Sequence, residues 1–146
     1  MAAKKIKGRK RHIVVDTMGN LLSVHVHAAN IHDTKSGIWP ARKALAIYPG
    51  IKGFCADAGY GGTFERKMLE IFNLEVHVLK RTRDAKWKVL PKRWIVERTF
   101  AWLNNYRRLS KDFEINVSSS EAMIKIAFSH LLLKRLRRQL LNQKIH

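Results

Sequence analysis

Hydrophobic residues recur every three or four positions in four segments, the spacing of a helix with one apolar face: residues 33–48, 63–72, 91–109 and 119–141. The rest of the chain is organised around the segment 91–109. Pro91 suits the first position of a helix, because the N–H that proline lacks has no partner there. The apolar stripe of this helix comprises Ile95, Thr99, Trp102, Tyr106 and Leu109. We therefore predict a single helix over residues 91–109.

The ends of two other helices carry recognisable capping residues. Asp33 is expected to cap the helix over 33–48, although Pro40 leaves its start open because proline is tolerated only in the first turn. Ser118 and Glu121 have the spacing of a capping box, which predicts the start of the last helix near residue 119.

Residues with β propensity occupy four shorter runs. Residues 12–15 and 21–28 are joined by DTMGN, whose Asp, Gly and Asn favour a turn, and this predicts a hairpin. Residues 51–56 and 74–79 are expected to be further strands. Strands that alternate with helices indicate an α/β fold with a mixed sheet flanked by helices, and the strand at 51–56 is expected to lie inside that sheet.

The length and composition fit one domain over residues 1–146. The chain is 46% hydrophobic, which supports a packed core. Its 29 Lys and Arg against 11 Asp and Glu give a net charge of +18. This excess of positive charge points first to a polyanion such as DNA as the partner.

Neither a membrane nor the secretory pathway is expected for this chain. The longest apolar stretch, residues 122–133, is interrupted by Lys125, Ser129 and His130. The first dozen residues hold six cations without an apolar core, unlike a signal peptide. The single cysteine, Cys55, fits a reducing cytoplasm, and the charge suggests association with the nucleoid.

The seven histidines lack the spacing of a zinc finger. His25 and His27 alternate along the strand predicted at 21–28 and therefore share one of its faces. We interpret them as surface residues of the strand rather than as metal ligands.

Glu97 is the only acidic residue between Asp84 and Asp112, and it lies in the helix predicted at 91–109. Arg93 precedes it by one helical turn. A carboxylate among so many cations is either an ordinary ion pair, contributing about 0.2–0.5 kcal/mol on a helix, or a metal ligand beside a phosphate-binding surface. The helix alone does not decide between these two interpretations.

Asp57 follows the strand predicted at 51–56 and opens the Gly-rich sequence DAGYGG. Functional groups collect at the carboxyl ends of strands in α/β sheets, although a turn or cap residue is the ordinary interpretation of such an Asp. Together, Asp57 and Glu97 could share a divalent cation. Mg²⁺ needs only one or two protein carboxylates when phosphate oxygens and water complete its coordination, and two such ions can activate both oxygens of a phosphodiester exchange.

Several long segments resemble one protein family: KKIKGRKRHIVVDTMGNLLSVHVHAANIHD, ADAGYGG, KRTRDAKWKVLPKRWIVERTFAWLNNYRRLSKDFE and SSEAMIKIAFSHLLLKRL. Together they resemble the C-terminal half of bacterial insertion-sequence transposases of the insertion sequence five family, which have a DDE catalytic core. The resemblance implies an RNase H-like fold and cut-and-paste DNA strand transfer with Mg²⁺ or Mn²⁺. It implies that Asp57 is the second catalytic Asp, Glu97 the catalytic Glu and metal ligand, and Arg93 part of the same signature.

The chain departs from the family pattern in two respects. Leu90 and Asn104 stand where the signature around the Glu has Tyr and Lys, and Arg108, one turn further along the helix, could supply the missing cation. In the family, the strand that carries the first catalytic Asp precedes a basic lead-in, and this chain begins at that lead-in, residues 4–11. Neither Asp16 nor Asp33 suits the role of the first catalytic Asp. The chain is therefore expected to lack the first strand and one of three carboxylates. The gap would leave an exposed strand edge that is prone to pairing with another chain.

Basic residues in the lead-in and in the loop 80–93 are the expected contacts to the DNA backbone, and Trp87 either stacks on an end base or packs under the loop. The expected DNA-binding residues are Lys7, Arg9, Lys10, Arg11, Arg81, Arg83, Lys86, Lys88, Lys92 and Arg108.

Two functions fit these residues. The chain is a transposase core that needs an upstream segment and assembles as a homo-oligomer on terminal-repeat and target DNA, or it is a non-catalytic DNA-binding protein that co-assembles with or inhibits a full-length transposase. A basic RNA-binding protein would explain the charge but neither carboxylate.

Overall fold

The computed structural model describes residues 8–79 and 92–143 of the 146-residue chain. Its first element is the predicted hairpin, formed by antiparallel β1 (Arg9–Val15) and β2 (Leu21–Ala28). The turn is held by Asp16, whose Oδ1 accepts the N–H groups of Met18 and Asn20 at 2.9 and 2.8 Å. Gly19 adopts a φ of +83°, which glycine tolerates best. The strand begins earlier than the predicted residue 12, within the basic lead-in.

The predicted helix over 33–48 is two helices. α1 (Asp33–Ser36) and α2 (Ile38–Ile47) meet at Gly37. Pro40 is the third residue of α2 and therefore lies in its first turn, as proline requires. The expected cap is wrong by one residue: His32 is the N-cap of α1, and its Nδ1 accepts the N–H of Thr34 at 3.3 Å.

A second pair of strands is parallel. β3 (Phe54–Asp57) pairs with β4 (Val76–Leu79), and they are connected by the 3-10 helix η1 (Ala58–Tyr60) and α3 (Thr63–Phe72). β3 therefore lies beside the strand predicted at 74–79. Among the described residues the two pairs of strands form separate sheets, so that β3 pairs on one edge only and is not inside one continuous sheet.

The helix predicted over 91–109 is shorter than expected. α4 (Arg93–Asn104) begins at Arg93, and the chain turns after Asn104 before the 3-10 helix η2 (Arg107–Leu109). Pro91 lies outside the described residues. Because Arg108 belongs to η2, it does not continue the face of α4 that carries Glu97, and the expectation that it would do so is wrong.

The last helix, α5 (Val117–Gln143), covers the predicted segment and begins slightly earlier. The expected capping box is not formed by Glu121. Its carboxylate instead accepts the N–H of Val26 at 3.0 Å and pairs with Lys43 at 3.0 Å. These bonds tie α5 to β2 and α2.

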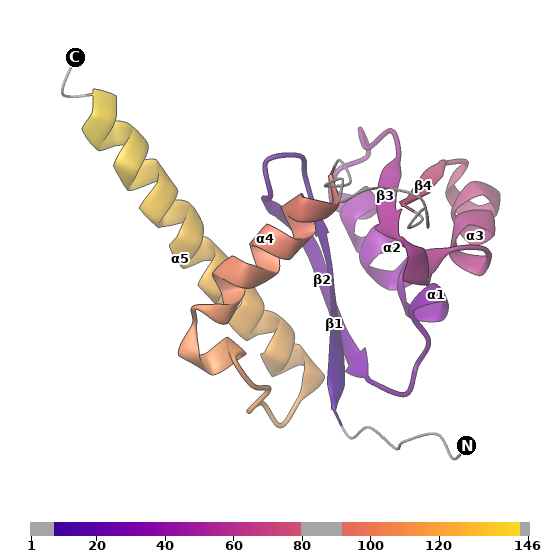
Figure 1. The fold of residues 1–146 in the computed structure, drawn as a ribbon, viewed down its shortest axis with the longest axis horizontal. Helices are drawn as coiled ribbons and strands as arrows, with labels where there is room; N and C mark the ends of the chain where they lie inside the picture. The colour runs from indigo at the N-terminus through magenta and orange to yellow at the C-terminus, as the bar shows by residue number, and fades with distance from the viewer. Residues whose placement is uncertain (1–7, 80–91, 144–146) are drawn as a thin grey trace, which may run out of the picture.

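The elements form layers around the hairpin, with α4 and α5 on one side of β1 and β2 and α2 on the other (Figure 1). The larger core lies between the hairpin and α5 and contains Val24, Val26, Leu103, Leu109, Ile124, Ala127 and Phe128. A smaller core packs α2 and α3 against β3 and β4 around Ala41, Phe64 and Met68. The chain is thus a mixed α/β protein with two small sheets covered by helices.

Among the described residues, no helix is both long and apolar enough to cross a bilayer.

Candidate active site

Asp57 is the last residue of β3 and caps η1, where its Oδ1 accepts the N–H of Ala58 at 2.5 Å. A carboxylate in this role is oriented by the backbone of the turn rather than by a distant partner. Half-buried and exposed residues alternate along β3, and the side chain of Asp57 is one of the exposed ones. Asp57 therefore lies at the carboxyl end of a parallel strand, the position that the sequence predicted.

Glu97 projects from the middle of α4 and is exposed. It lines a cavity of about 270 Å³ together with Asp57, from which it is separated by 40 residues of sequence. α4 reaches this position because it contacts both β1 and β3. The structure therefore brings the two predicted carboxylates to one hollow.

The rest of this cavity is mostly apolar. It lies between strands β1 and β3, with α2 and α4 on its other sides, and these elements contribute Ile13, Val14, Pro40, Ala41, Phe54, Val96 and Phe100. Exposed carboxylates at the edge of an apolar hollow suit a hard cation that keeps part of its water shell. Asp57 and Glu97 are the donors at the cavity that fit Mg²⁺ or Mn²⁺.

The described residues contain no group of three or more His, Cys, Asp or Glu side chains placed to hold one metal ion. Two carboxylates satisfy the protein's share of a Mg²⁺ site only when phosphate oxygens and water supply the remaining ligands. Asp57 and Glu97 alone would therefore hold Mg²⁺ only with such additional ligands.

The N-terminal end of α4 brings the cation of Lys92 to the same place. Lys92 is the N-cap of α4 and lines the cavity, with a φ of +74° that is uncommon outside glycine. Arg93 is the first residue of α4, one turn before Glu97.

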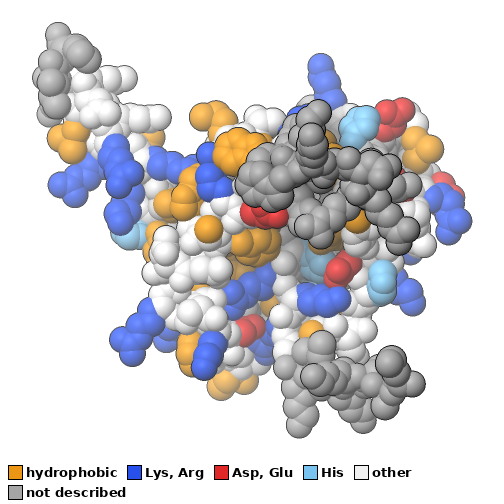
Figure 2. Space-filling view, viewed as in Figure 1, with side chains coloured by type: hydrophobic (Ala, Val, Ile, Leu, Met, Phe, Trp, Pro, Cys, Tyr) orange, Lys and Arg blue, Asp and Glu red, His pale blue; other side chains and the backbone are white. Residues whose placement is uncertain are grey.

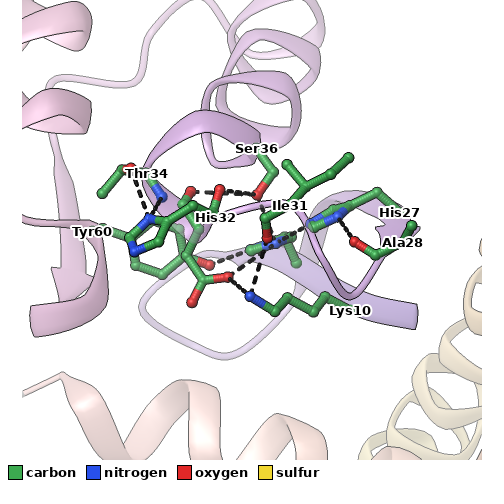
Figure 3. Close-up of polar contacts among 10 residues, drawn as sticks. Lys10, His27, Ala28, Ile31, His32, Thr34, Ser36 and Tyr60 are labelled. Carbon is green, nitrogen blue, oxygen red and sulfur yellow. Dashed lines mark hydrogen bonds and ion pairs between the residues drawn. The ribbon is translucent and has the colours of Figure 1, made fainter. Parts of the chain in front are cut away.

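A cluster of buried polar side chains, missed in the sequence, connects the hairpin to the turn that carries Asp57 (Figure 3). His12 Nδ1 bonds the hydroxyl of Tyr60, and His12 Nε2 lies 2.6 Å from His27 Nε2 and 3.1 Å from Ser36 Oγ. His12 and His27 are 5% and 6% exposed, so the expectation that His27 is a surface residue is wrong. Burial, and then the neighbouring His27, lower the pKa of His12 from 6.5 to about 4.

The charged groups around this cluster are Asp33 and Lys10. Lys10 Nζ pairs with Asp33 Oδ1 at 2.9 Å, and His12 Nε2 lies 3.9 Å from the same oxygen. Burial by itself would raise the pKa of Asp33, but the hydrogen bond and charge of Lys10 outweigh it and lower the pKa. For Tyr60, burial followed by Asp33 and Asp57 raises the pKa of the hydroxyl. The alternation of HVH along β2 was the one sequence signal for this cluster, and it does not show which face is buried.

Comparison with known proteins shows the family to which the chain belongs. Residues 2–132 match the family model described as a transposase DDE domain. The chain belongs to the DDE transposase domain family. It is also 31% identical over 139 residues to a proposed transposase for insertion sequence element IS402 from Burkholderia cepacia; the match covers 90% of this chain and 65% of that protein. No solved structure matches the chain.

Three of the basic residues that we expected to bind DNA in this DDE transposase domain are bonded to other parts of the protein. Arg9 pairs with Asp112 at 3.3 Å and donates to the carbonyls of Glu114 and Ile115 at 2.7 and 2.6 Å. Lys10 pairs with Asp33, and Arg11 donates to the carbonyl of Leu109 at 2.7 Å. Residues 9–11 at the end of the lead-in thus belong to β1, and their cations fasten the hairpin to its neighbours.

Arg108 is similarly engaged, since it pairs with Glu114 at 2.6 Å while its side chain remains 62% exposed. Other Lys and Arg side chains are scattered over the visible face of the transposase domain, including the projecting half of α5 (Figure 2). The remaining predicted DNA-binding residues lie outside the described residues: Lys7, Arg81, Arg83, Lys86 and Lys88, as does Trp87.

Proposed function

We propose that this chain supplies part of the catalytic centre of an insertion-sequence DNA transposase of the insertion sequence five family, with an RNase H-like fold. The observation that carries the proposal is that Asp57 and Glu97, from β3 and α4, line the same cavity. In this proposal the two carboxylates would hold Mg²⁺ or Mn²⁺, and the bound ion would supply Lewis-acid activation of the phosphodiester and of the attacking oxygen.

The roles of the protein groups follow from their positions. The N–H of Ala58 orients the Asp57 carboxylate, which limits the reorganisation needed when a cation binds. Lys92, the N-cap of α4, lines the same cavity as Glu97 and would attract the DNA backbone toward it. The proposed chemistry is phosphodiester cleavage and strand transfer at the ends of the element.

The chain alone is proposed to be incomplete. It spans about 65% of the length of the curated relative, and its described part brings two acidic groups rather than three to the cavity. The remaining Asp is proposed to come from another segment of a longer transposase, either fused to this chain or assembled with it, in a homo-oligomer on DNA.

Metal binding tests the two carboxylates directly. We expect weak binding of Mn²⁺ to the chain, measured by electron paramagnetic resonance of the free ion, and further weakening in Asp57→Asn and Glu97→Gln. Glu70→Gln is the matched control, because Glu70 is an exposed acidic residue of α3 whose pair with Arg66 spans 3.7 Å on the surface. Equal Mn²⁺ affinity in all four proteins would show that Asp57 and Glu97 are not ligands.

Cleavage tests the proposed activity. The chain is incubated with DNA carrying the ends of its element, with and without the upstream Asp-bearing segment, in Mg²⁺. We expect nicking only when that segment is present, and its loss in Glu97→Gln. A variant that removes a metal-binding carboxylate typically costs several orders of magnitude in rate.

DNA binding through the loop 80–93 is tested by salt dependence. Replacing Arg81, Arg83, Lys86 and Lys88 together with Ala should flatten the slope of log affinity against log salt, by about 0.9 for each phosphate that the protein no longer neutralises. An unchanged slope would place the DNA elsewhere on the protein.

The alternative is a non-catalytic DNA-binding protein that co-assembles with or inhibits full-length transposase. It is supported by the cavity lining, which among the described residues includes only two carboxylates. It predicts that the chain lowers cleavage by the full-length enzyme equally well when Glu97 is replaced with Gln.

A further inference from the structure

The two halves of α5 have different surroundings. Its buried residues all lie in the first half: Ser120, Ile124, Ala127 and Phe128. Further along, Leu131 packs against the larger core, and the guanidinium of Arg135 lies 4.2 Å from the centre of the Trp102 ring and donates to Asn20 at 3.2 Å. Beyond these contacts the helix projects away from the body of the protein (Figure 1).

The side of α5 that faces away from the hairpin carries a row of apolar side chains. Leu133, Leu136 and Leu140 are 64, 54 and 61% exposed, and Ile126, seven positions before Leu133, is 60% exposed. Residues three, four or seven positions apart share one side of a helix, so these four residues form one stripe. We call them the α5 stripe. At 3.6 residues per turn, it lies opposite the side that packs against the hairpin, so the larger core does not cover it.

Charges border the α5 stripe on one side only in the projecting half of the helix. Lys134 and Arg137 are exposed along one edge, whereas Gln139 and Gln143 lie along the other. No acidic residue follows Glu121 in the sequence. The cations precede the last turn of α5, where they would have stabilised the helix dipole most. The α5 stripe therefore has a basic edge and a neutral edge.

This one-sided charge narrows the choice of binding partner. An antiparallel pair of two α5 helices would set one basic edge against the other, in a chain whose net charge is already +18. DNA would attract the cations but would leave the leucines in water. A helix on an anionic bilayer gains from cations on both sides of its apolar face. An apolar helix with an acidic edge, by contrast, would satisfy both the leucines and the cations.

We propose that the α5 stripe docks an amphipathic helix of a partner protein whose apolar stripe is bordered by Glu or Asp on the side that meets Lys134 and Arg137. Burial of the leucines would supply most of the affinity, and the carboxylates would select the partner and its orientation. Leu, Lys, Arg and Gln favour helices, so that α5 is formed before the partner arrives and little ordering is needed on binding. The proposal uses neither carboxylate of the candidate active site and is independent of the proposed function.

Binding of a synthetic helical peptide to the full chain tests the surface. The acidic peptide has three heptads with leucine at the two apolar positions and glutamate at the two flanking positions of each heptad. It is labelled with fluorescein and kept at nanomolar concentration, so that it does not associate with itself, and its anisotropy is measured as the protein is titrated. The control peptide has glutamine in place of every glutamate. We expect saturable binding of the acidic peptide and weaker binding of the control.

Removal of the leucines tests the position of the binding surface. The triple variant Leu133→Ala, Leu136→Ala and Leu140→Ala should weaken binding of the acidic peptide by at least about a hundredfold, because each buried leucine contributes roughly 1.5–3 kcal/mol. These side chains are exposed, so their removal should leave the fold intact, as circular dichroism will show. Leu69→Ala with Ile71→Ala on α3 is the matched control, because it also removes exposed apolar side chains. Equal affinity in the two variants would overturn the proposal.

Exchange of charge tests the acidic edge of the partner separately from the general attraction of a basic protein. Lys134→Glu with Arg137→Glu should weaken binding of the acidic peptide about tenfold and strengthen binding of a peptide with lysine in place of glutamate. Exposed Arg42→Glu with Lys52→Glu changes the net charge equally at a distance from α5 and should have a smaller effect. The same loss of affinity in both variants would show that only net charge matters and would overturn the acidic partner.

The other occupants give different results. Sedimentation equilibrium that shows a dimer of the chain, lost in the triple leucine variant, would assign the α5 stripe to a second copy. Flotation with vesicles of phosphatidylserine and phosphatidylcholine, also lost in that variant, would assign it to a bilayer. Either result would overturn the proposal. A monomer that does not float and that binds the acidic peptide through the α5 stripe would support it.

Discussion

The two halves of the fold are built differently. The larger core joins residues from β2, α4, η2 and α5, so that segments about a hundred residues apart in the sequence enclose one another. The smaller core has only Ala41, Phe64 and Met68 fully buried, all from α2 and α3, with β3 and β4 half-buried beside them. Of the two candidate carboxylates, Asp57 lies on β3 beside this smaller core, whereas Glu97 lies on α4, which contributes Leu103 to the larger core.

The two halves also differ in the partners of their charged side chains. Around the hairpin, Arg9, Arg11 and Lys43 are bonded to carbonyls or carboxylates of distant elements. The Asp57 carboxylate, by contrast, is bonded to the backbone of its own turn, and β3 pairs on one edge. The hairpin half is therefore tied to distant elements through its cations, whereas the Asp57 carboxylate is held within its own turn.

The largest effect should come from the hairpin core. Phe128→Ala removes a ring that is 2% exposed and should lower the free energy of unfolding by about 3–5 kcal/mol. Phe113→Ala is the control, since that ring is 60% exposed and its removal should cost within about 0.5 kcal/mol. Urea denaturation measures both. Similar values for the two variants would mean that the hairpin and α5 do not form the main core.

Acid should destabilise the fold through His12. Its pKa of about 4 in the fold lies below its usual 6.5, so the unfolded chain takes up the proton first. The contribution of neutral His12 is complete above pH 6.5 and is lost as the pH falls toward 4, by about 3 kcal/mol at 1.36 kcal/mol per pKa unit. Lys10, Asp33, His25 and His27 are the charged or titratable groups that act on it.

Denaturation of His12→Gln at pH 7 and pH 4.5 measures this contribution. The variant should lose less stability over that interval than the natural protein, whereas exposed His130→Gln should behave like the natural protein. The same pH dependence in His12→Gln as in the natural protein would assign the acid effect to other groups.

The junction between the two halves should be sensitive to a single methyl group. A Cβ on Gly37 would lie 2.8 Å from the ring of Tyr60, and Gly37→Ala should therefore cost about 1–3 kcal/mol. Gly50→Ala is matched, since nothing lies within 4 Å of that position. Calorimetry gives the stabilities, and near-ultraviolet circular dichroism reports whether Tyr60 moves. Equal stability of the two variants would show that Tyr60 yields to the methyl group without cost.

The smallest effect should come from the lead-in cations. Arg9→Ala removes three bonds to residues 112–115 and should lower stability by about 1 kcal/mol. Exposed Lys125→Ala should leave it nearly unchanged. If Arg9→Ala instead leaves stability intact and reduces the salt slope of DNA binding, Arg9 serves DNA rather than the fold.

Local chemistry made much of the fold predictable. The hairpin was predicted because Asp16 and Gly19 build its turn from neighbouring residues, and α3 because its apolar stripe and its boundaries are both local. Asp57 and Glu97 were singled out because Asp57 follows a predicted strand and Glu97 interrupts a basic stretch, and their catalytic role stays a prediction. That both residues line one cavity depends on how distant elements pack together, and the spacing of residues along the chain does not show this packing.

Other features were missed for the same physical reason. The break at Gly37 accommodates the ring of Tyr60, which is 23 positions away in the sequence. Glu121 forms its bonds with Val26 and Lys43 instead of its own helix terminus. The burial of His12 and His27 depends on how α1 and η1 pack over the hairpin, and alternation along a strand cannot show which face is covered.

The donor and the acceptor in each hydrogen bond between the buried histidines and Tyr60 are fixed. His27 Nδ1 lies 2.7 Å from the carbonyl of Ala28, which can only accept, so the proton of neutral His27 is on Nδ1 and its Nε2 is an acceptor. His12 Nε2 must then be the donor toward His27, and His12 Nδ1 must receive the hydroxyl proton of Tyr60. The carbonyl oxygen of Ala28, at the end of β2, thereby sets the tautomers of His12 and His27. It also sets the direction in which the Tyr60 hydroxyl points its proton, in the turn after Asp57.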